Sequence, residues 1–556
     1  MYNCVNYRCK NFAAGRSSME QKTESKTNNH KFLKGTLILT ISSIVVKVIG
    51  SLNWIILSRV MGGEGIGLYQ MGFPIYLMAI TVSSAGIPVA ISIITAEKLA
   101  QKDYLGAQRV FHISLRLLLV TGIVFSGALL GGAGWLIDNH WIRDARAYYS
   151  IIALAPAVFF VTFLSSFRGY LQGWQIMTPT AASEIVEQLT RVVTMIFFAN
   201  MFMPRGLAYA AGGASMGAGV GAFCGLLVLC WFYARLKKQF RAEMDRQTAD
   251  FSRESAWDVV KRLIRLALPV SLSSLMLPVV ANLDLLIVPA RLEVAGFNVS
   301  EATEMFGYLT GMAVPLINLS TILTASLAIS LVPAISESRM IGDNNGIRSK
   351  LKTAFSVTSI ITIPCTIGLF ILAEKIATMI YNAPLAAPAI QTMSTAIFML
   401  GLHQVSTGIL QGLGKTTIPV VNMIVAAAAK VILSWTLTAI PWLGIKGAAW
   451  ATVADIGVAA VLNLFFIYKY TGFSLSIGGV LKPLVAALVM GAGVMGVLAL
   501  TPGWGAWNIL AAMIIAVPLY AVSLIALGGL HREEAEELPF IGRRILSFGQ
   551  KFGFYK

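Results

Sequence analysis

Charged side chains stand inside several long apolar stretches of the sequence. Lys47 lies in the middle of the first stretch, and later stretches carry Glu187, Arg191, Asp284, Lys430 and Asp455. A charge at the centre of a bilayer costs about 2.5–3.5 kcal/mol on insertion scales, so each of these groups needs a water-filled cavity, a ligand or an opposite charge. Lysine and arginine suit an anionic ligand. The acids could pair with these cations or couple ions.

The spacing of these charges separates two cases. Glu187 and Arg191 are four residues apart, so both lie on one face of a helix and can form an ion pair within it. Lys47 and Lys430 have no acid at helical spacing on their own helices. They therefore need an anionic ligand or a partner on another helix, for which Asp284 and Asp455 are the candidates, and we favour the ligand.

The elements that carry these charges are membrane-spanning helices. The chain is 56% hydrophobic and only 12% charged, with a mean hydropathy of +0.73, whereas soluble domains are roughly 25% charged. One span needs about 20 mostly apolar residues, and on that criterion the sequence predicts about fourteen helices. We therefore expect an all-α integral membrane protein without a sizeable soluble domain.

A five-residue signature occurs twice and indicates an internal duplication. The first copy, preceded by Arg168, is Gly169-Tyr170-Leu171-Gln172-Gly173, and the second is Gly408-Ile409-Leu410-Gln411-Gly412. A basic residue follows each copy at the same distance, Arg191 and Lys430 respectively. Duplicated halves in an apolar chain are typical of transporters. We interpret the signature itself as structural, because its glycines permit tight turns and close backbone approach at helix ends.

The positive charge predicts the topology and the domain boundaries. The formal net charge is +17, and Lys and Arg fall mostly in alternate loops, as the positive-inside rule requires. This pattern predicts a plasma-membrane protein with both termini in the cytoplasm, and it argues against a nucleic-acid partner. The predicted parts are a tail (1–33), a six-helix bundle (34–233), a basic linker (234–262), a second six-helix bundle (263–470), two further helices (471–530) and a tail (531–556).

Catalytic and metal-binding patterns are absent from the sequence. The five cysteines lack disulfide or metal-ligand spacing, and there is no phosphate-binding Walker loop and no His-Glu-x-x-His motif. We predict no cofactor, no metal and no enzymatic activity. Any driving force would then be an ion gradient, the membrane potential or the gradient of the substrate itself.

Several motifs carry a resemblance to a known family. The segment 32–98, with Ser58-Arg59-Val60-Met61-Gly62 and Gly86-Ile87-Pro88-Val89-Ala90-Ile91-Ser92, and the segment 167–173 resemble the stage V sporulation protein B and polysaccharide-export branch of the multidrug/oligosaccharidyl-lipid/polysaccharide exporter superfamily. The resemblance implies two bundles related by a pseudo-twofold axis, with a central cavity that opens to each side in turn. It also implies transport of polyprenyl-diphosphate-linked sugars, with spore cortex formation as one setting.

The resemblance also suggests roles for single residues. Lys47 stands where related lipid II flippases carry an arginine that faces the cavity, and Asn53 stands where they carry the first residue of an Arg-Asp pair. The predicted function is a flippase for a lipid-linked cell-envelope saccharide, acting as a monomer in the bilayer, with envelope-synthesis enzymes as candidate partners. Lys47, Asn53, Arg191 and Lys430 would bind the head group; Glu187, Asp284 and Asp455 would pair with them or couple ions.

Two alternatives remain open. One is a multidrug antiporter of the same superfamily that exports organic cations, for which a net acidic cavity is expected. The other is a membrane scaffold that transports nothing and docks envelope-synthesis enzymes through the basic linker and tail.

Overall fold

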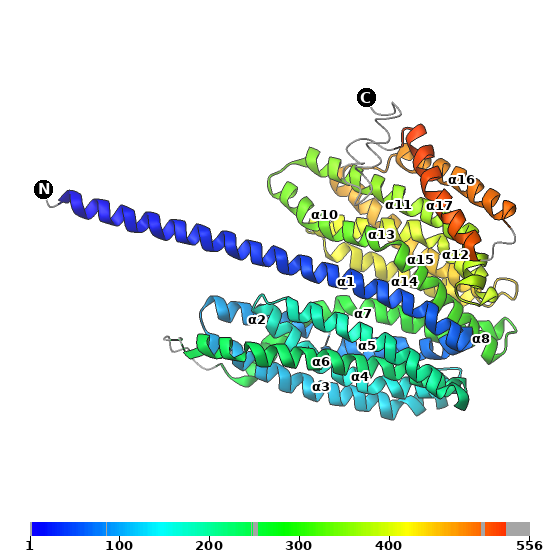
Figure 1. The fold of residues 1–556 in the computed structure, drawn as a ribbon, viewed down its shortest axis with the longest axis horizontal. Helices are drawn as coiled ribbons and strands as arrows, with labels where there is room; N and C mark the ends of the chain where they lie inside the picture. Colours follow the sequence, from blue (N-terminus) through cyan, green and yellow to red (C-terminus); the bar gives the residue numbers. More distant parts are fainter. Residues whose placement is uncertain (1–2, 85, 246, 248–253, 502–505, 530–556) are drawn as a thin grey trace.

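The computed structural model describes residues 3–84, 86–245, 247, 254–501 and 506–529. The described residues are almost entirely helical and contain no β-strand. Figure 1 shows two groups of helices, one with α2 to α6 and one with α10 to α17, and places α1 and α7 between them.

The N-terminal bundle contains the first six α-helices. Their bounds are α1 (Asn3–Ser84), α2 (Ile87–Ala100), α3 (Tyr104–Asp138), α4 (Tyr148–Gly173), α5 (Thr178–Phe202) and α6 (Leu207–Asp245), with short 3-10 turns at Ala145–Ala147 and Met203–Arg205. Helix α1 breaks at Gly62, where φ is 67°. The chain reverses there, first running toward α8 and then returning to α2 (Figure 1), so α1 contains two successive spans.

The C-terminal bundle repeats this order with more breaks. Its elements are α7 (Ala256–Val294), α8 (Val299–Gly307), a π-helix (Tyr308–Ala313), α9 (Val314–Ser320), α10 (Ile322–Met340), α11 (Asn344–Met379), a 3-10 turn (Pro384–Ala386), α12 (Ala387–Ser394), α13 (Ala396–Gly412), α14 (Thr417–Leu437) and α15 (Ile445–Thr471). Helices α16 (Ile477–Leu500) and α17 (Ala506–Ala526) follow and have no counterpart in the first half.

The number of spans agrees with the sequence. Within the described residues, eleven segments are long and apolar enough to cross a membrane, and two bent helix pairs meet the same criterion when each pair is taken as one span. The first segment, Ile41–Ala100, has 60 residues, far more than the roughly 20 that one span needs, and the break at Gly62 divides it into two. The predicted all-α membrane fold with about fourteen spanning helices is confirmed.

The duplicated signature has the same packing role in both halves. A Cβ atom added to Gly169 would lie 2.6 Å from the carbonyl oxygen of Pro88, and one added to Gly408 would lie 2.5 Å from that of Ala328. Pro88 and Ala328 are themselves 240 residues apart. The motif glycines therefore let α4 approach α2, and α13 approach α10, more closely than any side chain would allow.

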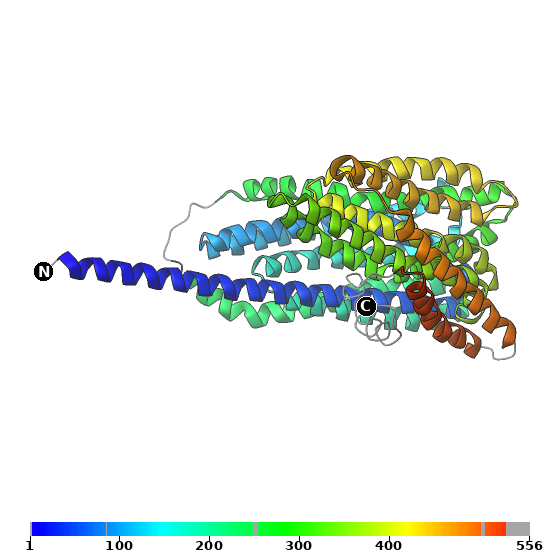
Figure 2. The same cartoon turned by 90° about the horizontal axis from the view of Figure 1, so that it is seen from above.

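The predicted boundaries differ from the helix ends in several places. Helix α1 begins at Asn3 and extends away from the bundles (Figures 1 and 2), so the predicted tail 1–33 is helical from its third residue. Helix α6 continues into the predicted linker, to Asp245, and α7 begins at Ala256. The predicted tail 531–556 lies outside the described residues.

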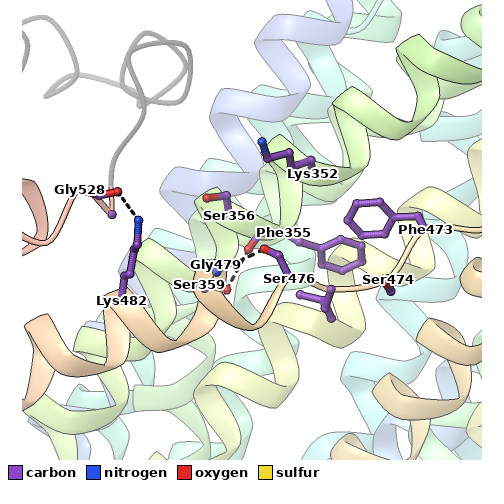
Figure 3. A pocket seen from close by; sticks show the side chains of 13 residues that line it. Lys352, Phe355, Ser356, Ser359, Phe473, Ser474, Ser476, Gly479, Lys482 and Gly528 are labelled. Atoms are coloured by element: carbon purple, nitrogen blue, oxygen red, sulfur yellow. Dashed lines mark hydrogen bonds between the residues drawn. The ribbon is translucent and has the colours of Figure 1, made fainter.

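Helices α16 and α17 attach to the C-terminal bundle through α11. A cavity of about 400 Å³ lies where they meet, lined by Lys352 and Ser356 of α11 and by Ser476 and Lys482. Figure 3 shows Lys482 directed at the carbonyl of Gly528, to which its Nζ donates at 2.8 Å. That hydrogen bond caps the carboxyl end of α17 and joins α16 to α17.

Candidate functional site

The N-terminal bundle holds a cluster of two arginines and one glutamate. Glu187 of α5 accepts a hydrogen bond from Arg191 at 2.6 Å and one from Arg168 of α4 at 2.9 Å. The side chains are only 12–19% exposed. The ion pair expected from the four-residue spacing is present, and the second arginine gives the three hydrogen-bonded groups a formal charge of +1. Glu184, one turn before Glu187 on α5, lies near enough to interact with Arg168 and Glu187 and adds one negative charge.

The C-terminal bundle holds the reverse combination. Lys430 of α14 donates to Asp284 of α7 at 2.7 Å, and Asp455 of α15 lies 4.0 Å from the same ammonium. Lys430 is 6% exposed. These three groups carry a formal charge of −1. Lys430 thus has the acidic partner on another helix that the sequence offered as the alternative to a ligand.

The two clusters occupy related positions. Arg191 and Lys430 are 239 residues apart, as are Ser183 and Asn422. Ser183 contacts Arg168 at 3.2 Å in the first half. In the second half Asn422 donates to Asn463 at 2.8 Å, and Asn463 donates to the two hydroxyls of Ser406 and Thr407. The position of Arg168 corresponds to Thr407, so the second half has a neutral polar network where the first has a cation.

Asn53 lies inside the N-terminal bundle, against α5. Its amide nitrogen is 3.6 Å from the sulfur of Met195, and the residue is 4% exposed. Its carbonyl oxygen, Oδ1, has no hydrogen-bond partner among the described residues, and neither does the buried Nε of Arg191. A buried acceptor and a buried donor thus remain available on neighbouring helices.

Lys47 is exposed on α1 and forms no ion pair with a described residue. Ser43, Lys47 and Ser51 follow at intervals of four residues and so share one side of the helix. A separate exposed stripe is purely apolar and contains Ile41, Val45, Val48, Leu52 and Ile56. The helix therefore presents one apolar and one polar exposed side.

The polar side of α1 lies close to the helix that carries the arginine cluster. Gly50, three residues after Lys47, packs against Gln188 of α5, since a Cβ there would lie 3.2 Å from the Gln188 side-chain nitrogen. Gln188 directly follows Glu187 in the sequence. The sequence-predicted residues Lys47, Asn53, Glu187 and Arg191 are thus on two packed helices, α1 and α5, whereas Asp284, Lys430 and Asp455 form a separate group.

Side-chain contacts join the two halves at the end that carries the Gly62 turn and α8. Within the first half, Arg146 donates to Glu64 at 2.7 Å, and Ser300 of α8 in the second half donates to the same carboxylate. Thr303 donates to Asp144 at 2.9 Å. Arg59 of α1 donates to the carbonyl of Ile380, at the end of α11, at 2.7 Å. A polar network therefore holds the boundary between the two halves, here called the seam, closed at this end.

The other end, which carries the connection from α6 to α7, is joined differently. Glu254 pairs with Lys98 at 2.7 Å, and the backbone N–H of Gly86 donates to Ser271 of α7 at 3.0 Å. Helices α10, α11, α13 and α15 pack on one another, whereas α7 packs both on α1 and α2 and on α14. Helix α7 is the main bridge between the halves at this end.

Comparison with known proteins agrees with this architecture. Residues 32–339 match the family described as polysaccharide biosynthesis protein. The chain belongs to this family. Residues 309–436 also match the MatE family. The resemblance found in the sequence motifs is confirmed.

Two relatives of this family member come from Bacillus subtilis (strain 168). Stage V sporulation protein B is 28% identical over 523 residues, which cover 93% of this chain and 99% of the relative. The lipid II flippase MurJ is 26% identical over 486 residues, covering 84% and 87%. The solved inward closed conformation of the lipid II flippase MurJ shares the fold, with a TM-score of 0.64 at 15% identity over 88% of this chain and 98% of that structure.

Two features of the site were not expected from the sequence. Arg168 was assigned to the structural signature, yet it pairs with Glu187. Its charge at the end of an apolar stretch was the available signal. The network around Glu64 and Arg146 was also missed, because the two residues are far apart in the sequence and their partner Ser300 lies in the other half.

Proposed function

We propose that this protein is a membrane flippase that moves a polyprenyl-diphosphate-linked saccharide to the outer leaflet by alternating access of its two bundles. Membership of the polysaccharide biosynthesis family supports the proposal, as do relatives named as a sporulation protein and a lipid II flippase. On this proposal the protein has no enzymatic role, and the plasma membrane is its site of action.

The observation that carries the proposal is the exposed Lys47 in a membrane-spanning helix. An ionisable residue at such a position faces water or a ligand, not lipid, and Lys47 shares its side of α1 with two serines. The nearby Arg168 and Arg191 supply two guanidinium groups. Together these groups would favour a diphosphate, whose oxygens accept hydrogen bonds from ammonium and guanidinium groups.

The orientation follows from the distribution of charge. We assign the end with the basic linker and both termini to the cytoplasm, by the positive-inside rule. The closed network of Glu64, Arg146 and Ser300 then lies on the outer side, so the seam would open to the cytoplasm and admit the head group from the inner leaflet. An inside-negative potential would assist outward movement of an anion by about 2.3 kcal/mol per charge per 100 mV.

The second cluster would have a different task. Lys430 already has one carboxylate at hydrogen-bond distance and a second at 4.0 Å, so we assign it to charge balance within the C-terminal bundle. Asp455, the more distant carboxylate, remains the candidate for ion coupling.

The test is a flip assay in proteoliposomes with a fluorescent polyprenyl-diphosphate disaccharide and a membrane-impermeant quencher. Lys47→Gln should slow the transfer of the fluorescent lipid between the two leaflets about tenfold or more. The reason is that a lost charge-assisted hydrogen bond costs roughly 1.5–3 kcal/mol. Lys446→Gln is the matched control, since Lys446 is also exposed and has no ion-pair partner among the described residues. Equal rates for Lys47→Gln and the unchanged protein would contradict the proposal.

The cluster of Asp284 and Asp455 favours one other function. Two carboxylates around one ammonium would accept a cation if Lys430 moved away, as an organic-cation antiporter requires. Uptake of a fluorescent organic cation into proteoliposomes, driven by a proton or sodium gradient and lost in Asp455→Asn, would favour the antiporter. No such uptake is expected from a flippase.

A further inference from the structure

A second cavity lies at the linker end of the C-terminal bundle, where the ends of α10, α11, α13 and α15 meet. Its volume is about 500 Å³, and its lining includes Arg339, Arg348 and Lys415 but no acidic residue. Among the described residues, no carboxylate forms an ion pair with any of these three cations. The cavity therefore concentrates uncompensated positive charge in a space that could hold a small ligand.

The two arginines are held in place by the ends of neighbouring helices. Arg339 Nη1 donates to the carbonyl of Leu413 at 2.6 Å, and Arg348 Nε donates to that of Thr471 at 2.9 Å. The following residues, Gly414 and Gly472, have φ values of 70° and 64° and lie directly under the guanidinium groups. Each arginine uses one nitrogen for its helix end, so the planar fork is positioned with further N–H donors left over.

Lys415 is also held beside the cavity. Its Nζ lies 4.9 Å from the ring centroid of Tyr470, and its own backbone N–H bonds to Leu410 at 2.8 Å. An ammonium over an aromatic face keeps its three donors available.

The duplicated half shows that the fold does not require this cavity. At the related place the ring of Tyr104 stacks on that of Trp174, with 6.1 Å between the ring centroids. The ring of Trp174 packs in turn on that of Phe240, with 4.5 Å between their centroids. Tyr104 corresponds to Asn344, since the residues before them, Asp103 and Asp343, cap their helices in the same way.

Two differences open the space in the second half. Trp174 corresponds to Leu413, and Phe240 belongs to a helix that continues to Asp245, whereas α15 ends at Thr471. Smaller side chains and a shorter helix thus leave room where the first half is filled by rings. The basic residues are also confined to this half, because the positions related to Arg339 and Arg348 are Leu99 and Gln108.

We propose that this cavity binds the phosphate group of an anionic ligand, either a soluble phosphorylated molecule or the head group of an anionic phospholipid. Arg339, Arg348 and Lys415 supply the charge-assisted donors. The guanidinium groups of the two arginines can each bind two oxygens of a phosphate in the bidentate manner. The site lies among helix ends of the C-terminal bundle and does not include Lys47 or Arg191, so it stands independently of the transport proposal.

The test measures protection of Lys415 in the full-length protein. The purified protein is treated with an amine-acylating reagent, and mass spectrometry follows the acylation of Lys415 and of Lys469, an exposed neighbour that does not line the cavity. One arm adds inorganic pyrophosphate in neutral detergent. The other compares nanodiscs of phosphatidylcholine alone with nanodiscs that also contain phosphatidylglycerol.

A bound phosphate group should slow acylation of Lys415 by about tenfold or more and leave Lys469 unchanged. Protection by pyrophosphate identifies a soluble ligand class, and protection only by phosphatidylglycerol identifies a lipid head group. Asn344→Tyr keeps every charge and restores the ring found in the first half, so it should abolish the protection. Lack of protection in both arms, or equal protection in Asn344→Tyr, would overturn the proposal.

Discussion

The two halves of the molecule keep the same helix packing but carry charge clusters of opposite sign. In the first half Glu187 is shared by Arg168 and Arg191, whereas in the second Lys430 lies between Asp284 and Asp455. The motif glycines, in contrast, make matching contacts in both halves. Packing at the duplicated corners has been retained while the chemistry of the interior has diverged.

This difference separates residues that look alike in the sequence. Arg191 and Lys430 follow the duplicated signature at the same distance, yet the Nε donor of Arg191 has no partner among the described residues, whereas Lys430 has two acids near it. An excess of cation donors suits an anionic ligand. An excess of carboxylates suits a cation, either a side chain of the protein or a bound ion. The first half of one transporter can therefore bind the head group while the second half balances charge.

The largest expected effect comes from removing the one cation of the second cluster. Lys430→Met leaves two buried carboxylates without a counter-charge, and breaking a buried pair in this way costs about 3–5 kcal/mol. We expect a marked fall in thermal unfolding temperature, measured for the purified protein in detergent. The double variant Lys430→Met with Asp284→Asn should recover much of the loss, because the most closely paired charge is removed as well.

The corresponding change in the first cluster provides the comparison. In Arg191→Met, Glu187 keeps its hydrogen bond from Arg168 at 2.9 Å, so the loss should be smaller than in Lys430→Met. Equal losses in the two variants, or no recovery in the double variant, would show that the opposite signs of the clusters do not determine their stability.

An intermediate effect is expected where the halves are alike. Gly169→Ala and Gly408→Ala each place a methyl group about as close to a backbone carbonyl, at 2.6 and 2.5 Å. Overpacking of this kind typically costs 1–3 kcal/mol. The two variants should lose similar stability in the same unfolding measurement.

Each glycine variant has a control, Gly127 in α3 of the first half and Gly478 in the appended helix α16. Gly127 and Gly478 have no neighbouring atom near an added Cβ, so their alanine variants should keep the stability of the unchanged protein. Very different losses in Gly169→Ala and Gly408→Ala would mean that the packing of the two corners is not equivalent.

The sequence predicted the features that depend on local pattern. Helix number and the duplication follow from apolar length and from repeated motifs, and the pair Glu187–Arg191 follows from spacing along one helix. The partners of Lys430, by contrast, lie on α7 and α15, and spacing within one chain segment says nothing about which helices meet. The cavity at Arg348 depends on where α15 ends and on which side chains are small. The contact from Ser300 to Glu64 depends on how the two halves meet.

The smallest change in stability is expected at Asn53, and here again the halves differ. Asn463, in the second half, is fully engaged, since it accepts from Asn422 and donates to two hydroxyls; Asn463→Leu would leave these groups unpaired and should cost about 1–3 kcal/mol. Asn53 has only a long contact to sulfur and an unpartnered Oδ1. Because replacing an unsatisfied buried polar group by an apolar one of similar shape can be nearly neutral, Asn53→Leu should change the unfolding free energy little while slowing flipping if Asn53 contacts the head group. Unfolding and flip assays on the same preparations separate these effects: a large loss of stability in Asn53→Leu would make Asn53 a structural residue like Asn463, and unchanged flipping would remove it from the substrate site.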